Sequence, residues 1–242
     1  MIFNLFKSKP TLKELIPNGF IDIHSHILPG IDDGAKNIKE SKELIDKMNE
    51  MGFAKIIGTP HTYQGLYDNT NESIIKSYNL VLDKIPLEID IGYASEYMLN
   101  NSLLDKLASQ SILCLKENYI LIEMSYIAPP INLYEIIFEI QINKYIPILA
   151  HPERYRFLHK DFRQYKKLKQ MGCLFQSNLL SFTDFYGRDI SKIADKLLKK
   201  KMIDFLGSDI HNMKHIKAFE KKIITKDTSE LKEVCEKNIL FK

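Results

Sequence analysis

The sequence predicts an α/β protein in which parallel strands alternate with helices. Roughly seven short apolar runs, each the length of a buried strand, alternate with segments whose apolar residues recur at helical spacing. The second run, residues 54–59, is mostly apolar, which is typical of a parallel strand covered on both faces. This alternation is compatible with an open doubly wound sheet or with a closed barrel.

Local signals place the elements along the chain. Phe20, Ile21 and Ile23 begin the first strand, and Pro29 and Gly30 end the extended segment. A helix over 36–51 carries its apolar residues on one face, and a glycine follows it as a stop signal. Later strands are predicted at 87–94, 119–122, 146–150, 173–176 and 203–207. Later helices are predicted at 72–84, 103–108, 133–143, 161–171, 189–200 and 229–238.

Composition narrows the classes of function. The chain has 34 basic and 31 acidic residues, and its lysines are scattered, so we expect no nucleic-acid surface. Its three cysteines are widely spaced, which argues against a disulfide framework and for a reducing compartment. No apolar run approaches the length needed to span a bilayer. We therefore expect a cytoplasmic protein with no direct membrane insertion.

Potential metal ligands follow most of the predicted strands. His24 and His26 are two apart on a strand, so their side chains point the same way. In a β/α barrel the carboxyl ends of the strands converge on one face, where active sites are built. A single acidic residue there is more simply a helix cap or a surface charge, but so many ligands together predict a metal centre. The candidate ligands are His24, His26, Asp33, His61, Glu96, Glu123, His151, Asp209 and His211.

Imidazole and carboxylate ligands without thiolate suit Zn, Mn or Fe, and the carboxylate share favours the harder metals. Nine candidate ligands are too many for one ion, so two or three ions would share them. Glu96 is the best placed residue to bridge ions. Clustered ions generate hydroxide near neutral pH and hold phosphoryl oxygens. The sequence thus predicts metal-assisted hydrolysis, with a phosphate ester as the natural substrate.

Other chemistries lack their motifs. None of the cysteines is followed by Arg at the spacing of a cysteine-based phosphatase, and no Gly-rich nucleotide loop or G-x-S-x-G turn occurs. Arg154 could grip a phosphate with two parallel hydrogen bonds, or form a structural salt bridge. After His61, the side chains of Tyr63, Leu66 and Tyr67 could pack on an aromatic ring, or simply anchor their loop.

Six motifs occur in a fixed order: DIHSHILPGIDDG, TPH, SE at Glu96, IEMS, AHPERY and SDIHN. Together they resemble the polymerase and histidinol phosphatase (PHP) superfamily. Within it they are similar to the bacterial CpsB/YwqE-type metal-dependent tyrosine-protein phosphatases of capsule and exopolysaccharide gene clusters. The resemblance runs from about Ile21 to Asn212. It implies an N-terminal arm, residues 1–19, and a single PHP domain, residues 20–242, folded as a distorted (β/α)7 TIM-like barrel.

The resemblance also implies three divalent ions, with manganese as the first expectation and iron or zinc as alternatives. Matched motif by motif, the ligand sets are His24, His26, Glu96 and Asp209 for one ion, Glu96, Glu123 and His151 for a second, and Asp33, His61 and His211 for a third. Arg154 matches the phosphate-binding arginine of the family. The expected catalytic residues are Arg154, Asp209 and His211.

The substrate that the resemblance implies is phosphotyrosine on a protein, typically the C-terminal tail of a tyrosine autokinase that governs polysaccharide export. Metal-bound hydroxide would attack phosphorus directly. Members often carry a second arginine after SDxHN, whereas Lys214 and His215 stand there in this chain. The alternatives are a small-molecule phosphatase, such as a histidinol-phosphate phosphatase, and a non-catalytic, metal-stabilised module that binds a kinase tail. The oligomeric state is left open.

Overall fold

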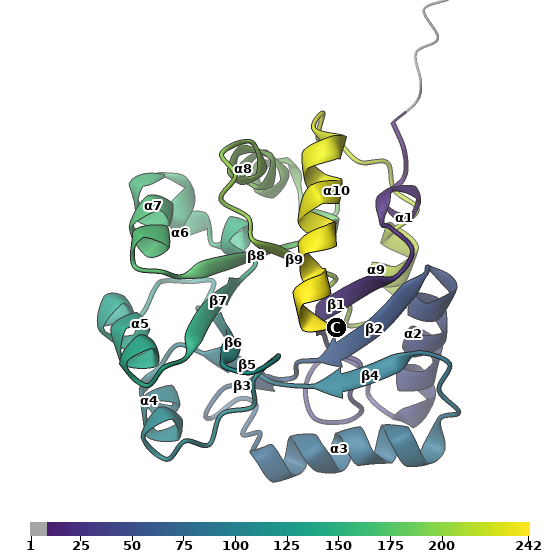
Figure 1. Ribbon diagram of the computed structural model, residues 1–242, viewed down its shortest axis with the longest axis horizontal. Coiled ribbons are helices and arrows are strands. Elements are labelled where there is room, and N and C mark those ends of the chain that lie inside the picture. The colour runs from purple at the N-terminus through teal and green to yellow at the C-terminus, as the bar shows by residue number, and fades with distance from the viewer. Residues whose placement is uncertain (1–8) are drawn as a thin grey trace, which may run out of the picture.

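The structure, a computed structural model, describes residues 9–242 as alternating strands and helices, with the helices arranged around the strands (Figure 1). The strands are β1 (Phe20–Ser25), β2 (Phe53–Gly58), β3 (His61–Thr62), β4 (Asp90–Tyr93), β5 (Glu96–Met98), β6 (Tyr119–Glu123), β7 (Ile146–Ala150), β8 (Leu174–Asn178) and β9 (Phe205–Gly207). The helices are α1 (Leu12–Leu15), α2 (Ile38–Glu50), α3 (Asn71–Lys84), α4 (Asn101–Ala108), α5 (Leu133–Ile142), α6 (Arg156–His159), α7 (Arg163–Gln170), α8 (Arg188–Lys199), α9 (Met213–Ala218) and α10 (Thr228–Lys237). Three 3₁₀ turns are η1 (Pro152–Arg154), η2 (Leu179–Phe182) and η3 (Asn238–Phe241).

The named strands pair in parallel and form two sheets, in the orders β1–β2–β4 and β3–β5–β6–β7–β8–β9. Only two residues separate β2 from β3, and two separate β4 from β5. Backbone hydrogen bonds cross both gaps, because the Ala94 N–H donates to the Gly58 carbonyl and the Glu96 N–H donates to the Pro60 carbonyl. The sheets therefore continue one another, and the predicted parallel alternation of strands and helices is confirmed.

Strands β1 and β9 are adjacent without a regular ladder. They are joined near their carboxyl ends by one bridge, Ser25 with Ile210. The buried Asn238 side chain also joins the two strands. Its amide donates to the carbonyls of Ile21 at 2.8 Å and Leu206 at 2.6 Å, and its Oδ1 accepts from the Leu206 N–H. The pairings thus give parallel sheets whose ladder does not close, and the closed barrel stays a prediction.

Alternate residues of the strands pack into two different apolar clusters. On β6, Ile120 and Ile122 join the larger cluster, which includes the helices, whereas Leu121 joins a smaller one. This is the two-residue period of a strand that is covered on both faces. The smaller cluster comprises Ile21, Ile23, Ile57, Ala94, Leu115, Leu121, Ile148, Ala150, Phe205 and Phe241. Its last member comes from the C-terminal turn, so the end of the chain completes this inner core.

Residues of the predicted arm also pack against the core. In α1, Leu12 and Leu15 are buried in the larger cluster, and the Leu12 N–H donates to the Lys221 carbonyl. The arm thereby contacts the segment between α9 and α10. Residues 1–8 lie outside the described part of the chain. The boundary between arm and domain at residue 19 stays a prediction.

The structure departs from the sequence predictions mainly at short elements. The predicted strand 87–94 begins at Asp90, and Glu96 begins β5 rather than following a strand. The sequence missed α1, α6 and α9 because helices of four to six residues carry no recognisable period. Helix α2 begins two residues later than predicted because the Asn37 side chain caps it by accepting a hydrogen bond from the Glu40 N–H.

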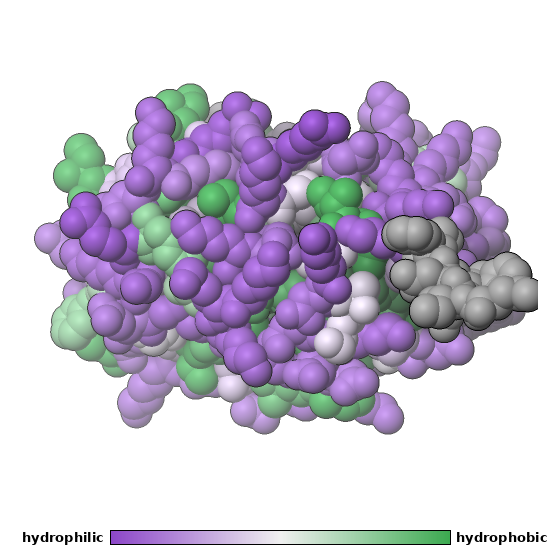
Figure 2. All heavy atoms as spheres, turned by 90° about the horizontal axis from the view of Figure 1, so that it is seen from above, coloured by the Kyte–Doolittle hydropathy of each residue, from purple (hydrophilic) through white to green (hydrophobic). Residues whose placement is uncertain are grey.

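The surface matches the near balance of charges. In the view of Figure 2 hydrophilic residues dominate, and apolar residues form small separate patches. Among the described residues, no helix has the length and apolar character needed to cross a bilayer.

We expect Asn238→Ala to lower the free energy of unfolding by roughly 2–4 kcal/mol, because it leaves buried backbone groups of β1 and β9 without partners. Urea denaturation followed by circular dichroism measures this change. The exposed neighbour Lys237 provides the control, since Lys237→Ala removes no such bond. Equal stability of the two variants would show that β1 and β9 do not depend on this amide.

Candidate metal centre

The structure brings all nine predicted ligand residues to one end of the strands. Six of them are buried: His24, His26, Glu96, Glu123, His151 and Asp209. Asp33, His61 and His211 lie at the edge of the cluster with partly exposed side chains. Because burial of so many ionisable groups is costly unless they are paired or bound to an ion, the arrangement demands a compensating interaction.

Four side chains of the first expected set converge on one point. His24 Nε2 lies 3.2 Å from Glu96 Oε2 and 3.4 Å from Asp209 Oδ1. His26 Nε2 lies 3.5 Å and 3.4 Å from the same two oxygens. The two imidazole nitrogens therefore face two carboxylate oxygens, and the four atoms are close enough together to bind one ion.

The third expected set also converges. One oxygen of Asp33, Oδ1, lies 3.5 Å from His61 Nε2 and 3.5 Å from His211 Nε2. The second expected set is divided between neighbours. Glu123 Oε1 lies 2.8 Å from His61 Nδ1, whereas His151 Nε2 lies 3.0 Å from Glu96 Oε1. Glu96 Oε2 also lies 3.0 Å from His61 Nδ1, so Glu96 contacts members of all three sets, as expected for a bridging carboxylate.

The backbone at the strand ends is bent to deliver these side chains. His151 and Asp209 both have positive φ angles, 37° and 52°, a conformation that residues with side chains adopt infrequently. The Asp209 N–H donates to the His24 carbonyl at 2.7 Å, which ties the end of β9 to β1. Gly34 lets the Asp33 turn approach β1, since a Cβ there would lie 2.1 Å from the His26 carbonyl oxygen.

Three polar residues that the sequence analysis did not single out as ligands orient the cluster. His24 Nδ1 donates to Gln176 Oε1, and His26 Nδ1 donates to Asp32 Oδ2, each at 2.7 Å. Asn178 donates its amide to Asp209 Oδ2 at 2.6 Å. These contacts leave Nε2 of both imidazoles facing the carboxylates, as in metal sites where a second polar residue fixes each histidine. Gln176 and Asn178 stand two apart on β8, a spacing that could have revealed them.

Burial and mutual charge perturb the cluster strongly. Burial opposes the charged form of His26, yet the Asp32 carboxylate raises its pKa well above the ordinary value. Burial likewise opposes the charged form of His61, yet Glu96 and Glu123 raise its pKa well above the usual range. Burial and the Glu96 charge raise the pKa of Glu123 to about 7. A bound cation would therefore compete with protons for these groups.

The donor set fits divalent metal ions. Glu96 Oε2 and His151 Nδ1 are buried atoms without a hydrogen bond of normal geometry, although Glu96 Oε2 lies within ion-pair distance of imidazole nitrogens. Groups of three or four ligand atoms lie within 4.8 Å of one another. A buried cluster of imidazoles and carboxylates with such orphaned atoms is suited to Zn, Mn or Fe.

A cavity of about 250 Å³ opens beside the cluster. Arg154 lies in its wall, where its guanidinium is held between the rings of Tyr126, at 4.8 Å, and Tyr186, at 4.4 Å. One guanidinium N–H donates to Asp209 Oδ2 at 2.9 Å. His215 lines the same cavity, whereas Lys214 lines a neighbouring one.

Of the predicted aromatic mouth, Tyr67 stacks on His61, with ring centroids 5.3 Å apart. Leu66 is exposed beside it, and the Tyr63 backbone pairs with that of Tyr67 to close the loop. The loop therefore serves as an anchor for His61 and also borders the cluster.

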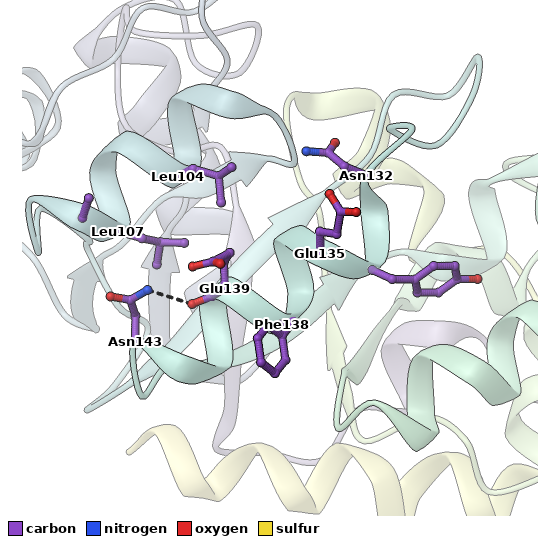
Figure 3. Close-up of a pocket in the computed structure, with 9 residues that line it drawn as sticks. Leu104, Leu107, Asn132, Glu135, Phe138, Glu139 and Asn143 are labelled. Carbon is purple, nitrogen blue, oxygen red and sulfur yellow. Dashed lines mark hydrogen bonds between the residues drawn. The ribbon is translucent and has the colours of Figure 1, made fainter.

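A larger cavity, about 710 Å³, lies between α4 and α5 (Figure 3). Its wall includes Leu104, Leu107 and Phe138, together with Glu135 and Glu139. It contains none of the nine predicted ligands. The candidate functional site is therefore the smaller cavity, because that cavity adjoins the ligand residues and the larger one does not.

An α/β fold that buries imidazoles and carboxylates beside a cavity containing Arg154 has the donor set of a metal-binding protein. The family "Capsular polysaccharide synthesis, CpsB/CapC" matches residues 20–241. Over 200 residues the chain is 31% identical to tyrosine-protein phosphatase YwqE of Bacillus subtilis, covering 80% of this chain and 78% of that one. It is 30% identical to putative tyrosine-protein phosphatase CapC of Staphylococcus aureus, with 80% and 77% covered.

A solved structure of the same family is also similar to this chain. It comes from work on YwqE from B. subtilis and CpsB from Streptococcus pneumoniae, described as unique metal-dependent tyrosine phosphatases. The match has a TM-score of 0.74 and 28% identity, and it covers 88% of this chain and 86% of the other. The chain belongs to the CpsB/CapC family.

We expect divalent ions to displace protons from this cluster. Neighbouring carboxylates raise the pKa values of His26 and His61, so these rings hold protons more strongly than a free imidazole, and metal binding requires them to lose those protons. Affinity for Mn²⁺ should therefore rise with pH across and above neutrality. Titrating chelator-treated protein with Mn²⁺ in weakly buffered indicator solution measures the proton release.

The variants His61→Asn and His159→Asn form a matched pair for this titration. The first removes a ring of the cluster and should lower the number of protons released. The second changes a histidine that bonds to the Glu153 carbonyl and should leave the number unchanged. Affinity that falls as pH rises would contradict the expected linkage.

Proposed function

We propose that this protein is a metal-dependent protein-tyrosine phosphatase that acts in the cytoplasm on a phosphotyrosine protein. The observation that carries the proposal is the buried cluster of imidazoles and carboxylates directly beside Arg154 in one cavity. The relatives YwqE, a tyrosine-protein phosphatase, and CapC, a putative one, support the same activity. The substrate protein that we propose is a tyrosine autokinase of polysaccharide export, dephosphorylated on its C-terminal tail.

We assign three divalent ions to the cluster, manganese first, with iron or zinc as alternatives. The ligand sets remain those expected from the family motifs, with Glu96 shared between two of them. When bound, such ions lower the pKa of water and neutralise charge on phosphoryl oxygens. We also infer that the two continuous sheets correspond to the distorted seven-unit barrel of the PHP superfamily.

Arg154 is the residue proposed to bind the phosphate. Its planar guanidinium can offer two parallel N–H groups, and its contacts with Asp209, Tyr126 and Tyr186 fix it before substrate arrives. Asp209 thus aligns the arginine as well as facing the two histidines of β1. His211 lines the same cavity, so Arg154, Asp209 and His211 form the proposed catalytic group.

His215 is a better candidate than Lys214 for the position of the second family arginine, because it shares the cavity with Arg154. Its burial lowers the pKa to about 4, so the ring is neutral. A neutral ring can contribute one hydrogen bond to the phosphate but no charge.

The alternatives make different predictions. A small-molecule phosphatase of the histidinol-phosphate type more often has histidine where Asp33 and Glu123 stand. A non-catalytic module that binds a kinase tail would need neither a complete ligand set nor an oriented arginine. The two tyrosines that line the cavity, Tyr126 and Tyr186, favour an aromatic phosphate over an aliphatic one.

We expect the chelator-stripped protein, reloaded with Mn, Fe or Zn, to hydrolyse a phosphotyrosine peptide in preference to histidinol phosphate. His151→Ala removes a buried ring that contacts Glu96 and should abolish the release of phosphate. Colorimetric phosphate release measures both substrates. Preference for histidinol phosphate would support the first alternative, and metal binding without turnover would support the binding module.

We expect Arg154→Lys to lower kcat/KM on the phosphotyrosine peptide about 10–100-fold while metal content is unchanged. Lysine keeps the charge, but it cannot reproduce the two parallel hydrogen bonds of the guanidinium. Steady-state kinetics and metal analysis of the same preparation separate the two effects. Arg163→Lys is the control, because Arg163 is exposed and pairs only with Asp161 among the described residues. Unchanged kinetics in Arg154→Lys would exclude this arginine from substrate binding.

A further inference from the structure

The loop between β6 and α5 is an unusually apolar piece of surface. Five of its six residues from Tyr126 to Ile131 are exposed, and all six are apolar or aromatic. Ile127 and Ile131 have relative exposures of 91% and 107%, the highest of the large apolar side chains in the described part of the chain. Single exposed apolar residues are common, but a continuous run of them marks an interaction site.

This loop adjoins the cavity through its first residue. The Tyr126 side chain lines the cavity, and its ring lies 5.7 Å from that of His151 and 4.8 Å from the Arg154 guanidinium carbon. The whole residue is nevertheless 47% exposed. One part of Tyr126 therefore forms the cavity wall, and the other continues into the surface that carries Ile127 and Ile131.

The loop is also held in shape. Pro129 and Pro130 fix two successive φ angles, and the Leu133 N–H donates to the Pro130 carbonyl at 3.1 Å where α5 begins. At the other end, the Ile127 N–H donates to Ser125 Oγ at 3.2 Å. A surface with few accessible conformations loses little entropy when it binds a partner.

We propose that residues Tyr126–Ile131 form a docking surface for an apolar side chain that neighbours the phosphotyrosine in a peptide substrate. The proposal rests on the proposed phosphatase function. A phosphotyrosine whose phosphate reaches Arg154 must carry its flanking residues across the rim of the cavity, and Tyr126 connects this rim to the apolar loop. The occupant is thus an extended phosphopeptide, with Ile127 and Ile131 contacting an aliphatic residue beside the phosphotyrosine.

The test compares two phosphotyrosine peptides of equal length, one with leucines and one with serines beside the phosphotyrosine, on metal-loaded full-length protein. We expect the wild type to prefer the leucine peptide. The double variant Ile127→Ser/Ile131→Ser should lose this preference, with a roughly tenfold higher KM for the leucine peptide, because less apolar surface is buried. Its kcat/KM for p-nitrophenyl phosphate, which has no flanking residues, should equal that of the wild type.

Ile239→Ser is the matched control, because Ile239 is 61% exposed and lies in η3, away from the residues that line the cavity. Equal kinetics of the double variant and the wild type on both peptides would overturn the docking proposal and leave the phosphatase function intact. A change of oligomeric state in gel filtration, with unchanged peptide kinetics, would instead assign the loop to contacts between copies and also overturn it. Failure of the wild type to hydrolyse any aryl phosphate would overturn the phosphatase function, and the docking proposal with it.

Discussion

The structure depends on holding several imidazoles and carboxylates within about 3.5 Å of one another in a buried cluster. Glu96 and Asp209 are fully or almost fully buried, and both face His24 and His26. Isolated charges in such a place are strongly disfavoured, so each group must be paired or bound to an ion. The strained backbone at His151 and Asp209 is tolerated because surrounding hydrogen bonds fix it, which is usual where function requires a precise geometry.

Asp209 contacts several of the other groups of the site. Its N–H bonds to β1, its carbonyl accepts from His211, and its carboxylate accepts from Arg154 and Asn178. The same carboxylate faces the histidines of β1. Positions of the arginine and of the histidine pair are therefore coupled, and a small displacement of β9 would disturb both. The buried Asp22, which accepts from the Ser208 N–H and hydroxyl, holds β9 against β1 one residue earlier.

Much of this arrangement could be predicted from the sequence because the ligands follow apolar runs directly. The strand β7 and the two histidines of β1 were recognised by period and composition alone. The orienting residues carry a weaker signal. Gln176 lies inside a strand and is recognisable only by its two-residue spacing from Asn178, and Asp32 stands beside a better candidate, Asp33. Which side chain of such a pair faces the cluster depends on the turn, and Gly34 determines that turn by its close approach to His26. Glu123 contacts His61, whereas His151 contacts Glu96. This difference depends on side-chain packing, which sequence spacing does not encode.

The charges of the cavity indicate where substrate selectivity must lie. Among the described residues that line it, Arg154 is the only Arg or Lys, whereas Asp33 and Asp209 contribute carboxylates. A phosphate dianion would be repelled by these acids unless cations offset their charge, so phosphate binding and metal binding belong together in this site. Since any phosphate monoester offers the same dianion, the phosphate itself cannot distinguish one monoester from another. Discrimination must come from the other groups at the cavity, which are the lining side chains Tyr126 and Tyr186, Tyr67 stacked on His61, and the apolar loop that follows Tyr126.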